Sequence, residues 1–275
     1  MQTDAIIKDI YLGYEAKEKT ALRRTHLGAS VIGDKCKRNI FYEFRWYYKE
    51  GIEGRILRLF DTGKREEERV LDNLWDLGFI LRQPEVGDQI RFSDSSGHIG
   101  GSVDGIIDHI PAKYGYDKFE SCILEIKTHS EKNFKKLQKE RVLGGFPKHF
   151  HQMQYYMGSM AQPLALYIGV NKNTDEIYME FIEADEFVFR GLKTKAEDIL
   201  VSTEVPQGIS ANGSWFECKL CKFNPICHGD VTPDKNCRSC KHSVVVEGGK
   251  WGCKLHNCNL DYNKQIVGCD QFDLR

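Results

Sequence analysis

The sequence predicts an α/β fold in which a mixed β-sheet is flanked by helices. Three observations support this class. Segments 121–130, 165–172 and 177–184 have the apolar or alternating pattern of strands, segment 61–79 has apolar residues at helical spacing, and segment 146–160 is predicted as a second helix. With 275 residues, of which 41% are hydrophobic, the chain is long enough for a well-packed core and a small appendage.

Charge and hydropathy restrict the classes of partner. No window approaches the roughly 20 apolar residues that a membrane span requires, so we expect a cytoplasmic protein with no membrane partner. The net charge is −1, and any contact with nucleic acid must therefore come from local basic patches. The candidates for such contacts are Lys35, Lys37 and Arg38 around Cys36, and Lys135 and Lys136 in "EKNFKKLQKER". The second patch has an alternative interpretation as an ordinary solvated helix face.

The predicted helix at 61–79 carries a candidate acidic residue. Its expected buried stripe consists of Val70, Leu71, Leu74 and Trp75. At about 100° per residue, Glu67 lies near the centre of this stripe, whereas Glu66 and Glu68 fall to either side. Glu67 is therefore expected to face inward. In the alternative interpretation, the helix starts later and all three glutamates are solvated.

Two charged residues, Glu125 and Lys127, lie in the apolar strand "SCILEIKTHS". Strand alternation points both side chains to one face, roughly 7 Å apart. A second predicted strand, at 98–110, carries Asp104, and antiparallel pairing of the two strands would bring Asp104 beside Glu125. Two adjacent carboxylates repel each other unless a divalent cation lies between them, and Mg²⁺ suits such oxygen ligands.

The predicted helix at 146–160 places Gln152 and Tyr156 on one face, because they are four residues apart. Together with the preceding segments, this pair resembles the PD-(D/E)xK nucleases of the RecB type, including lambda-like phage exonucleases and CRISPR-associated RecB-like nucleases. The resemblance covers most of the chain. It consists of "GxxxE" at Gly63 and Glu67, "GxxDG" at Asp104, "ExK" at Glu125 and Lys127, and "QxxxY" at Gln152 and Tyr156, in the order of the family.

The resemblance implies a restriction-endonuclease-like core and a role for each motif residue. Asp104 and Glu125 would bind Mg²⁺ or Mn²⁺ with the carbonyl of Ile126, Glu67 would be an additional acid of the metal site, and Lys127 would be the catalytic lysine. Many relatives have His where Glu67 stands. A carboxylate-bound cation can activate water and stabilise charge on a phosphate, and Lys127 could orient or deprotonate that water. Gln152 and Tyr156 are expected to position the nucleic-acid backbone.

The ten cysteines are unevenly distributed. Cys36 and Cys122 are isolated, whereas the others lie between Cys218 and Cys269. Paired C-x2-C spacings in a chain without a secretory signal favour thiolate metal ligands over disulfides. Cys122 is expected to be a small buried residue of its strand.

The first cysteine group follows a C-x2-C-x5-C spacing at Cys218, Cys221 and Cys227, which leaves one ligand to be found. Local spacing alone favours zinc with His228 as the fourth ligand. A subset of RecB-type nucleases, which this chain also resembles, pairs such a triad with an N-terminal cysteine around a [4Fe-4S] cluster. The matching residue is Cys36, so the cluster would clasp the start of the chain to the end of the core.

The second group resembles a zinc ribbon or knuckle. It contains Cys237, Cys240, Cys253, Cys258 and Cys269, one more cysteine than a tetrahedral site needs. "WGC" and "VGC" resemble the terminal module of some phage nucleases, which implies Cys253 and Cys269 beside Cys237 and Cys240, with Cys258 as the alternative. Trp251 is expected to pack on this module and not to stack on a base.

These predictions divide the chain into a nuclease core at 1–205, an iron-sulfur motif at 206–230 and a zinc module at 231–275. The resemblance implies a metal-dependent exonuclease acting at DNA ends in recombination, repair or phage replication, in a bacterial, archaeal or phage-infected cell. Its partners would be DNA and a recombination protein such as a single-strand-annealing protein. The alternatives are a CRISPR-adaptation nuclease and a non-catalytic, metal-stabilised DNA-binding protein.

Overall fold

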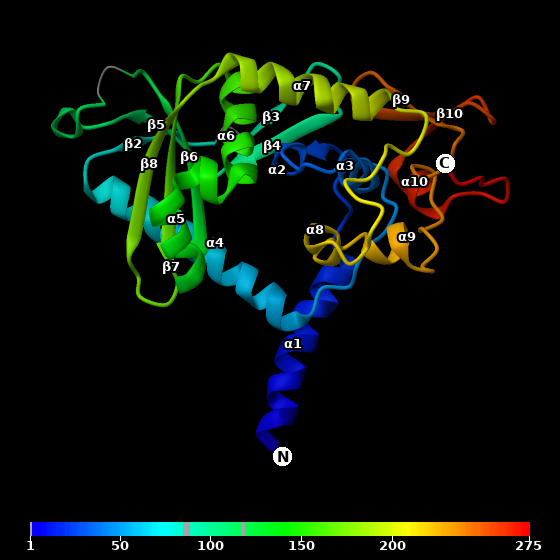
Figure 1. Ribbon diagram of the computed structural model, residues 1–275, viewed down its shortest axis with the longest axis horizontal. Coiled ribbons are helices and arrows are strands. Elements are labelled where there is room, and N and C mark those ends of the chain that lie inside the picture. Colours follow the sequence, from blue (N-terminus) through cyan, green and yellow to red (C-terminus); the bar gives the residue numbers. More distant parts are fainter. Residues whose placement is uncertain (1, 85–88, 117–118) are drawn as a thin grey trace. The chain divides into compact units, whose positions relative to one another are not determined.

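The computed structural model describes residues 2–84, 89–116 and 119–275, which form two compact units (Figure 1). The first unit consists of Met1–Leu22, Gly51–Phe92 and Ser102–Phe189, and the second of Arg23–Glu50, Ser93–Gly101 and Arg190–Arg275. The boundary predicted after residue 205 lies within the second unit. No described helix is both long and apolar enough to span a membrane.

The first unit is built on a five-stranded mixed sheet, which confirms the predicted α/β class. The strand order is β2 (Ile80–Leu81), β5 (Gly105–His109), β6 (Cys122–His129), β7 (Leu164–Asn171) and β8 (Ile177–Glu183). Only the central pair, β6 and β7, is parallel among the described pairings of this sheet. Their carboxyl ends therefore meet at one edge of the sheet.

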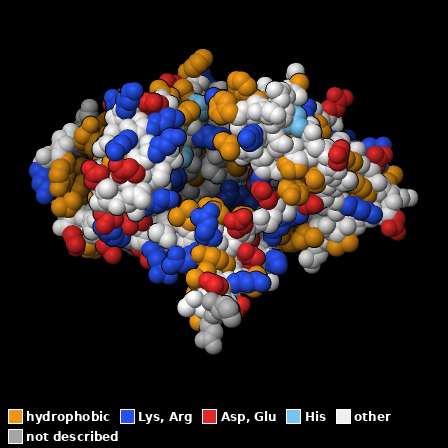
Figure 2. All heavy atoms as spheres, turned by 60° about the horizontal axis from the view of Figure 1, so that its bottom comes forward, with side chains coloured by type: hydrophobic (Ala, Val, Ile, Leu, Met, Phe, Trp, Pro, Cys, Tyr) orange, Lys and Arg blue, Asp and Glu red, His pale blue; other side chains and the backbone are white. Residues whose placement is uncertain are grey.

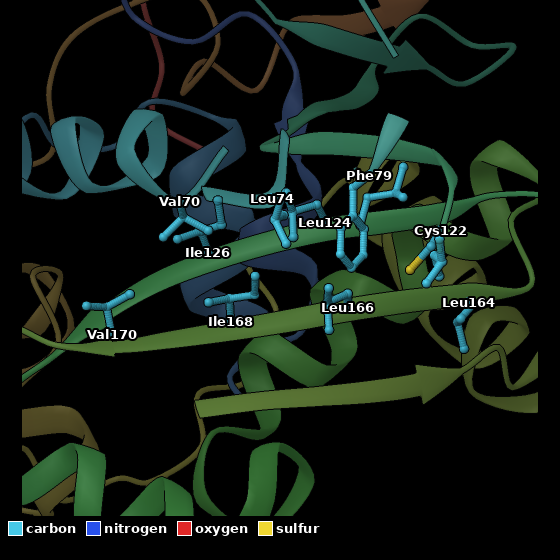
Figure 3. Packing of buried hydrophobic residues seen from close by; sticks show 12 residues of the cluster. Val70, Leu74, Phe79, Cys122, Leu124, Ile126, Leu164, Leu166, Ile168 and Val170 are labelled. Carbon is cyan, nitrogen blue, oxygen red and sulfur yellow. The ribbon is translucent and has the colours of Figure 1, made fainter. Parts of the chain in front are cut away.

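Helix α4 (Gly54–Asp76) covers one face of this sheet. Its Val70 and Leu74 pack on Leu124 and Ile126 of β6 and on the apolar residues of β7 (Figure 3). The prediction for Trp75 was wrong, because its side chain is 59% exposed. Trp75 follows the buried Leu74 directly, and the rotation of about 100° per residue turns its side chain away from the sheet. Cys122 is fully buried in the same cluster, as predicted.

The opposite face is covered by α5 (Glu131–Gly145) and α6 (Pro147–Met160). Gly169 of β7 permits the close approach of α5, because an added Cβ would lie 2.5 Å from Cδ2 of Leu137. Helix α1 (Gln2–Thr20) packs on α4. Helix α7 (Glu186–Val201) follows β8, and a short 3-10 helix spans Ala112–Tyr114.

The strand predicted at 98–110 is interrupted at Asp104. Strand β4 (Ile99–Val103) ends before it, and β5 begins after it. The first residues of β4 pair in parallel with β1 (Leu27–Gly28), and β3 spans Ile90–Ser93. A change of sheet at Asp104 frees this residue from regular pairing, which the hydrophobic pattern alone does not indicate.

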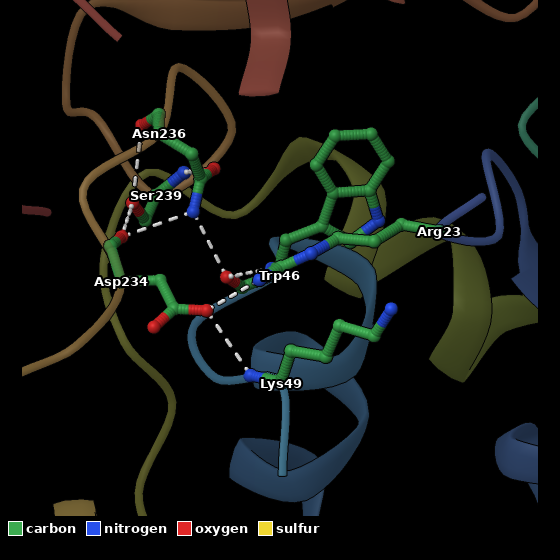
Figure 4. Close-up of polar contacts among 6 residues, drawn as sticks. All are labelled: Arg23, Trp46, Lys49, Asp234, Asn236 and Ser239. Atoms are coloured by element: carbon green, nitrogen blue, oxygen red, sulfur yellow. Dashed lines mark hydrogen bonds and ion pairs between the residues drawn. The ribbon is translucent and has the colours of Figure 1, made fainter. Parts of the chain in front are cut away.

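The second unit brings residues 23–50 together with the carboxyl-terminal part of the chain. Asp234 pairs with Arg23 at 2.5 Å and accepts a hydrogen bond from the Lys49 backbone N–H at 3.1 Å, while Asn236 donates to the Trp46 carbonyl at 2.9 Å (Figure 4). Besides most of α7, its helices are α2 (Ala29–Ile32), α3 (Lys37–Phe44), α8 (Phe216–Lys219), α9 (Asn224–His228) and α10 (Tyr262–Val267).

A three-stranded antiparallel sheet of β9 (Ser243–Val246), β10 (Lys250–Cys253) and β11 (Cys258–Leu260) completes this unit. Trp251 of β10 is fully buried, so the prediction that it packs inside the protein is confirmed. The guanidinium of Arg238 lies over the rings of Trp46 and Trp251, at 3.9 and 4.6 Å from their centroids. Such contacts offset the cost of burying a cation.

Candidate active site

The site begins where β5 and β6 diverge. The antiparallel register pairs Gly105 with Leu124, so Asp104 comes opposite Glu125, as the sequence predicts. Asp104 uses its Oδ2 to accept a hydrogen bond of 2.7 Å from the Ile126 backbone N–H. The carboxylate thus replaces the strand partner that β6 loses at this point.

The ammonium of Lys127 lies among three oxygens. Nζ is in an ion pair with Oε1 of Glu125, donates to the Ile126 carbonyl at 3.0 Å, and lies 3.5 Å from Oδ2 of Asp104. Burial lowers the pKa of Lys127, but the charges of Glu125 and Asp104 outweigh burial and raise the pKa above its ordinary value. Lys127 is therefore a cation at neutral pH.

Glu125 is fully buried, and burial raises its pKa against the opposing effect of Lys127. Its Oε1 accepts a hydrogen bond of 2.7 Å from Nε2 of Gln152, which also donates to the Tyr156 hydroxyl at 3.0 Å. Its Oε2 has no partner in the described part of the chain. Gln152 and Tyr156 are themselves buried, so the structure places the "QxxxY" side chains behind Glu125, where they hold the carboxylate in position.

Glu67 approaches from α4 and is half-buried. Burial raises its pKa first, the charge of Asp104 raises it further, and Lys127 and Lys64 oppose the rise. Glu67 and Lys127 line the same pocket. All four charged residues of the predicted motifs are therefore close together.

Behind Lys127 lies a buried hydrogen-bonded cluster that sequence reasoning did not identify. The Tyr167 hydroxyl lies 2.8 Å from Nε2 of His129 and 2.9 Å from Nδ1 of His149. Burial, followed by the charge of Lys127, lowers the pKa of His129 to about 4 and that of His149 to about 3. Alternation along β6 was the available signal, because it places His129 on the same face as Glu125 and Lys127.

A pocket of about 410 Å³ opens beside this group of charges. Helix α4 supplies one wall and the carboxyl ends of β6 and β7 supply the other. The lining residues are Leu59, Phe60, Gly63, Lys64 and Glu67 of α4, Ile126, Lys127 and Thr128 of β6, and Lys172 after β7. The pocket is within the volume range of small-molecule sites, roughly 300–1,000 Å³.

The oxygen donors suit a hard divalent cation. Carboxylates of Asp104 and Glu125 and the Ile126 carbonyl are the ligand types that Mg²⁺ and Mn²⁺ prefer, and Oε2 of Glu125 lacks a partner. In the arrangement observed, the described residues contain no group of three His, Cys, Asp or Glu side chains placed to hold a metal ion. The ammonium of Lys127 lies where the oxygens converge.

The predicted nucleic-acid contacts all have partners within the chain. Lys35 pairs with Glu217 at 2.9 Å, Lys37 with Asp198 at 3.7 Å and Lys135 with Glu131 at 2.6 Å, while Arg38 and Lys136 donate to the carbonyls of Pro206 and Gly145. Figure 2 shows basic side chains interspersed with acidic ones on the face it displays. Exposed ion pairs contribute little to stability, so phosphates can replace these partners.

The first cysteine group lies within the second unit. Burial raises the pKa of Cys218, and the thiols of Cys36 and Cys221 raise it further. The pKa of Cys227 is raised by burial first and is also influenced by Cys221 and Cys36. The four cysteines predicted to bind the iron-sulfur cluster are therefore near one another, and none is in a disulfide.

The second cysteine group lines a separate pocket of about 420 Å³. All five of its cysteines, Cys237, Cys240, Cys253, Cys258 and Cys269, border this pocket together with His242 and His256. Burial raises the pKa of Cys237 to about 11, with Cys269 the strongest contributor among the neighbouring thiols. The register of β10 and β11 places Cys253 directly opposite Cys258. Cys253 and its predicted alternative Cys258 thus line the same pocket.

No family model and no curated protein matches the chain. Among solved structures, it is similar to an alkaline exonuclease (LHK-Exo) from Laribacter hongkongensis, at 16% identity over 65% of this chain and 87% of that chain, with a TM-score of 0.44. It is also similar to SSO0001, at 18% identity over 82% and 98% with a TM-score of 0.48. A phage-related exonuclease from Haemophilus somnus 129PT matches at 14% identity over 63% and 91%, with a TM-score of 0.39. The functional assignment therefore rests on the geometry of the site.

Proposed function

We propose that this chain is a Mg²⁺- or Mn²⁺-dependent deoxyribonuclease of the PD-(D/E)xK type that acts as an exonuclease at DNA ends. The observation that supports this most directly is the oxygen set around the Lys127 ammonium, formed by Asp104, Glu125 and the Ile126 carbonyl. Oxygens that accept an ammonium together have the charge and donor type that a hard divalent cation requires. Their order along the chain matches the motifs of that nuclease superfamily.

Each side chain then has a chemical role. A bound divalent cation supplies an activated water and stabilises charge on the phosphate. Gln152 and Tyr156 hold Glu125 in the orientation that binding requires. Lys127 would supply a positive charge to the scissile phosphate or orient the attacking water. Glu67, whose pKa is raised by burial and by Asp104, would be an additional acid of the metal site.

We also propose metal centres in the second unit. Cys36, Cys218, Cys221 and Cys227 would bind a [4Fe-4S] cluster, and Cys237, Cys240, Cys253 and Cys269 a zinc ion. The proximity of the thiols supports both centres. Neighbouring thiols raise the pKa values of Cys218 and Cys237, and a bound metal ion would offset the repulsion between the thiolates. The proposed partners are linear DNA and a single-strand-annealing protein, in the cytoplasm.

The test is degradation of end-labelled linear DNA, single- and double-stranded, with Mg²⁺, Mn²⁺ or a chelator. We expect metal-dependent release of label by the wild type, and loss of this activity in Asp104→Ala and Lys127→Ala. Asp108→Ala is the matched control, since Asp108 lies on β5 and pairs with the exposed Arg82. A closed DNA circle should remain intact.

The outcomes separate the alternatives. A wild type that binds DNA but cleaves neither ends nor circles would make the protein a non-catalytic DNA-binding protein. Cleavage of circles as fast as of linear DNA would contradict the requirement for ends while leaving the nuclease proposal in place. The position of the released label would report the polarity of digestion.

A further inference from the structure

The pocket beside Lys127 has a side-chain composition that the catalytic motifs do not explain. Phe60, Lys64 and Glu67 are four and three residues apart, so they follow one face of α4 towards the catalytic oxygens. Lys172 follows the end of β7 and lines the same pocket. In open α/β sheets, ligands bind at the carboxyl ends of parallel strands, which is where β6 and β7 end here.

Phe60 is a large apolar side chain that remains 54% exposed although it lines the pocket. Within the residues that the structure describes, its ring contacts no other aromatic ring or cation in the way that the buried rings do. An exposed ring at the wall of a pocket that also holds lysine side chains is suited to stacking on a nucleic-acid base, because every base has an apolar face.

Lys64 and Lys172 are exposed and differ from the basic residues that the sequence singled out. Lys35, Lys37 and Lys135 are each in an ion pair. In the described chain, neither Lys64 nor Lys172 is in an ion pair, although both exert electrostatic effects on the site, Lys64 on Glu67 and Lys172 on His129. Their positive charges are therefore available to a phosphate close to Lys127.

We propose that this pocket binds the nucleotide next to the scissile phosphate, with Phe60 stacking on its base and Lys64 and Lys172 contacting its phosphate. This inference rests on the proposed nuclease function and adds a substrate class to it. A base inside a duplex is already stacked on both faces, so only an unpaired or terminal base can stack on Phe60. The preferred substrate is therefore a strand with a single-stranded or opened end.

The experiment measures binding of a fluorescently labelled single-stranded oligonucleotide, in chelator to prevent cleavage and at several salt concentrations. Phe60→Leu should weaken binding about tenfold without changing its salt dependence, because it removes stacking and no charge. Lys64→Gln and Lys172→Gln should each weaken binding and reduce the slope of log K against log salt by about 0.7, the value for one phosphate contact on a single strand.

Two exposed residues of the first unit provide matched controls. Phe187→Leu changes a phenylalanine that is 87% exposed on α7, and Lys8→Gln removes one exposed charge from α1. Both should bind like the wild type. If the wild type binds and degrades DNA but the three pocket variants match it in affinity and salt slope, this inference fails while the proposed function stands. If the wild type neither binds nor degrades DNA, both fail.

Discussion

Lys127 owes its chemical character to its two acidic neighbours. A lysine acting as a general base needs a lowered pKa, which burial alone would provide. Glu125 and Asp104 reverse that effect and keep the ammonium charged. In the structure, the Lys127 ammonium therefore neutralises the carboxylates of Glu125 and Asp104, which are the proposed metal ligands.

The Lys127 ammonium and a metal ion are expected to compete for the same carboxylate oxygens, and replacing Lys127 tests this. Lys127→Met removes the ammonium, so we expect Mn²⁺ to bind about tenfold more tightly, a gain of about 1.4 kcal/mol, while DNA cleavage is lost. Without metal, the variant leaves Glu125 buried and unpaired, and it should unfold at a lower temperature than the wild type. Mn²⁺ should restore its stability more than it stabilises the wild type.

Calorimetric titration with Mn²⁺ and thermal unfolding with and without Mn²⁺ measure both effects. Lys8→Met, an exposed change on α1, is the control. Equal or weaker Mn²⁺ affinity in Lys127→Met would contradict competition between the ammonium and the metal.

The histidines behind Lys127 link stability to pH. Their pKa values in the folded protein, about 4 for His129 and about 3 for His149, lie below the ordinary value of 6.5. Below pH 6.5 the unfolded chain thus binds protons that the folded chain does not. Each histidine should lower the free energy of unfolding by about 1.4 kcal/mol per pH unit as the pH falls from 6.5 towards 4.

His149→Phe removes one of these two contributions. Urea unfolding at pH 6.5 and pH 5 should show a smaller loss of stability on acidification than in the wild type, by up to about 1.4 kcal/mol per pH unit. His109→Phe, at an exposed position of β5, should retain the loss seen in the wild type. An unchanged loss in His149→Phe would show that His149 binds protons equally in the folded and unfolded states, and so that its pKa is not lowered by folding.

At the scale of elements, the start of α4 depends on α1. Glu15 of α1 accepts a hydrogen bond of 2.8 Å from the Gly54 backbone N–H, one of the amides that a helix leaves unpaired at its start. The two helices touch at Gly54, where an added Cβ would lie 2.1 Å from the Tyr11 carbonyl oxygen. This contact, between residues far apart in the chain, explains why apolar periodicity placed the start of α4 too late.

Gly54→Ala should therefore destabilise the first unit by about 1–3 kcal/mol, because the added methyl group would force the backbone of α1 away from α4. Gly13→Ala is the matched control: this α1 glycine has open space around it, and alanine there should stabilise the helix by up to about 1 kcal/mol. Chemical denaturation measures both values. We expect Gly54→Ala to lower the free energy of unfolding and Gly13→Ala to raise it. Equal changes in the two variants would mean that α1 and α4 are not in close contact at Gly54.

At the scale of the whole molecule, the second unit is formed by segments that are distant in the sequence. Residues 23–50 pack with 190–275, and both predicted metal centres lie in this unit. Its core contains the buried guanidinium groups of Arg45 and Arg238, the former in contact with Ser243 at 3.1 Å. Metal binding at the proposed centres would add to the stability of this unit.

Metal content tests the two cysteine groups. Protein purified without oxygen should contain iron, sulfide and one zinc ion; Cys36→Ser should lose iron and sulfide but keep zinc. Cys253→Ser should lose zinc, whereas Cys258→Ser should retain it. Loss of zinc in Cys258→Ser would assign Cys258 as a ligand, and two zinc ions without iron would overturn the cluster assignment.

The sequence by itself determined what depends on local pattern. Alternation and helical period predicted strands β6, β7 and β8, helices α4 and α6, and the shared direction of the Glu125 and Lys127 side chains. Antiparallel pairing then predicted that Asp104 comes beside Glu125. These features follow from residues close in the chain, because side-chain direction repeats with a fixed period in each element.

Only the tertiary structure decided which groups meet across elements. It interrupted the strand at Asp104, placed Gln152 behind Glu125, and set Lys127 among the oxygens. It also gathered Phe60 and Lys172 in one pocket, although they are more than a hundred residues apart. Such contacts depend on how sheet and helices pack, and packing is a property of the whole chain that no local period encodes.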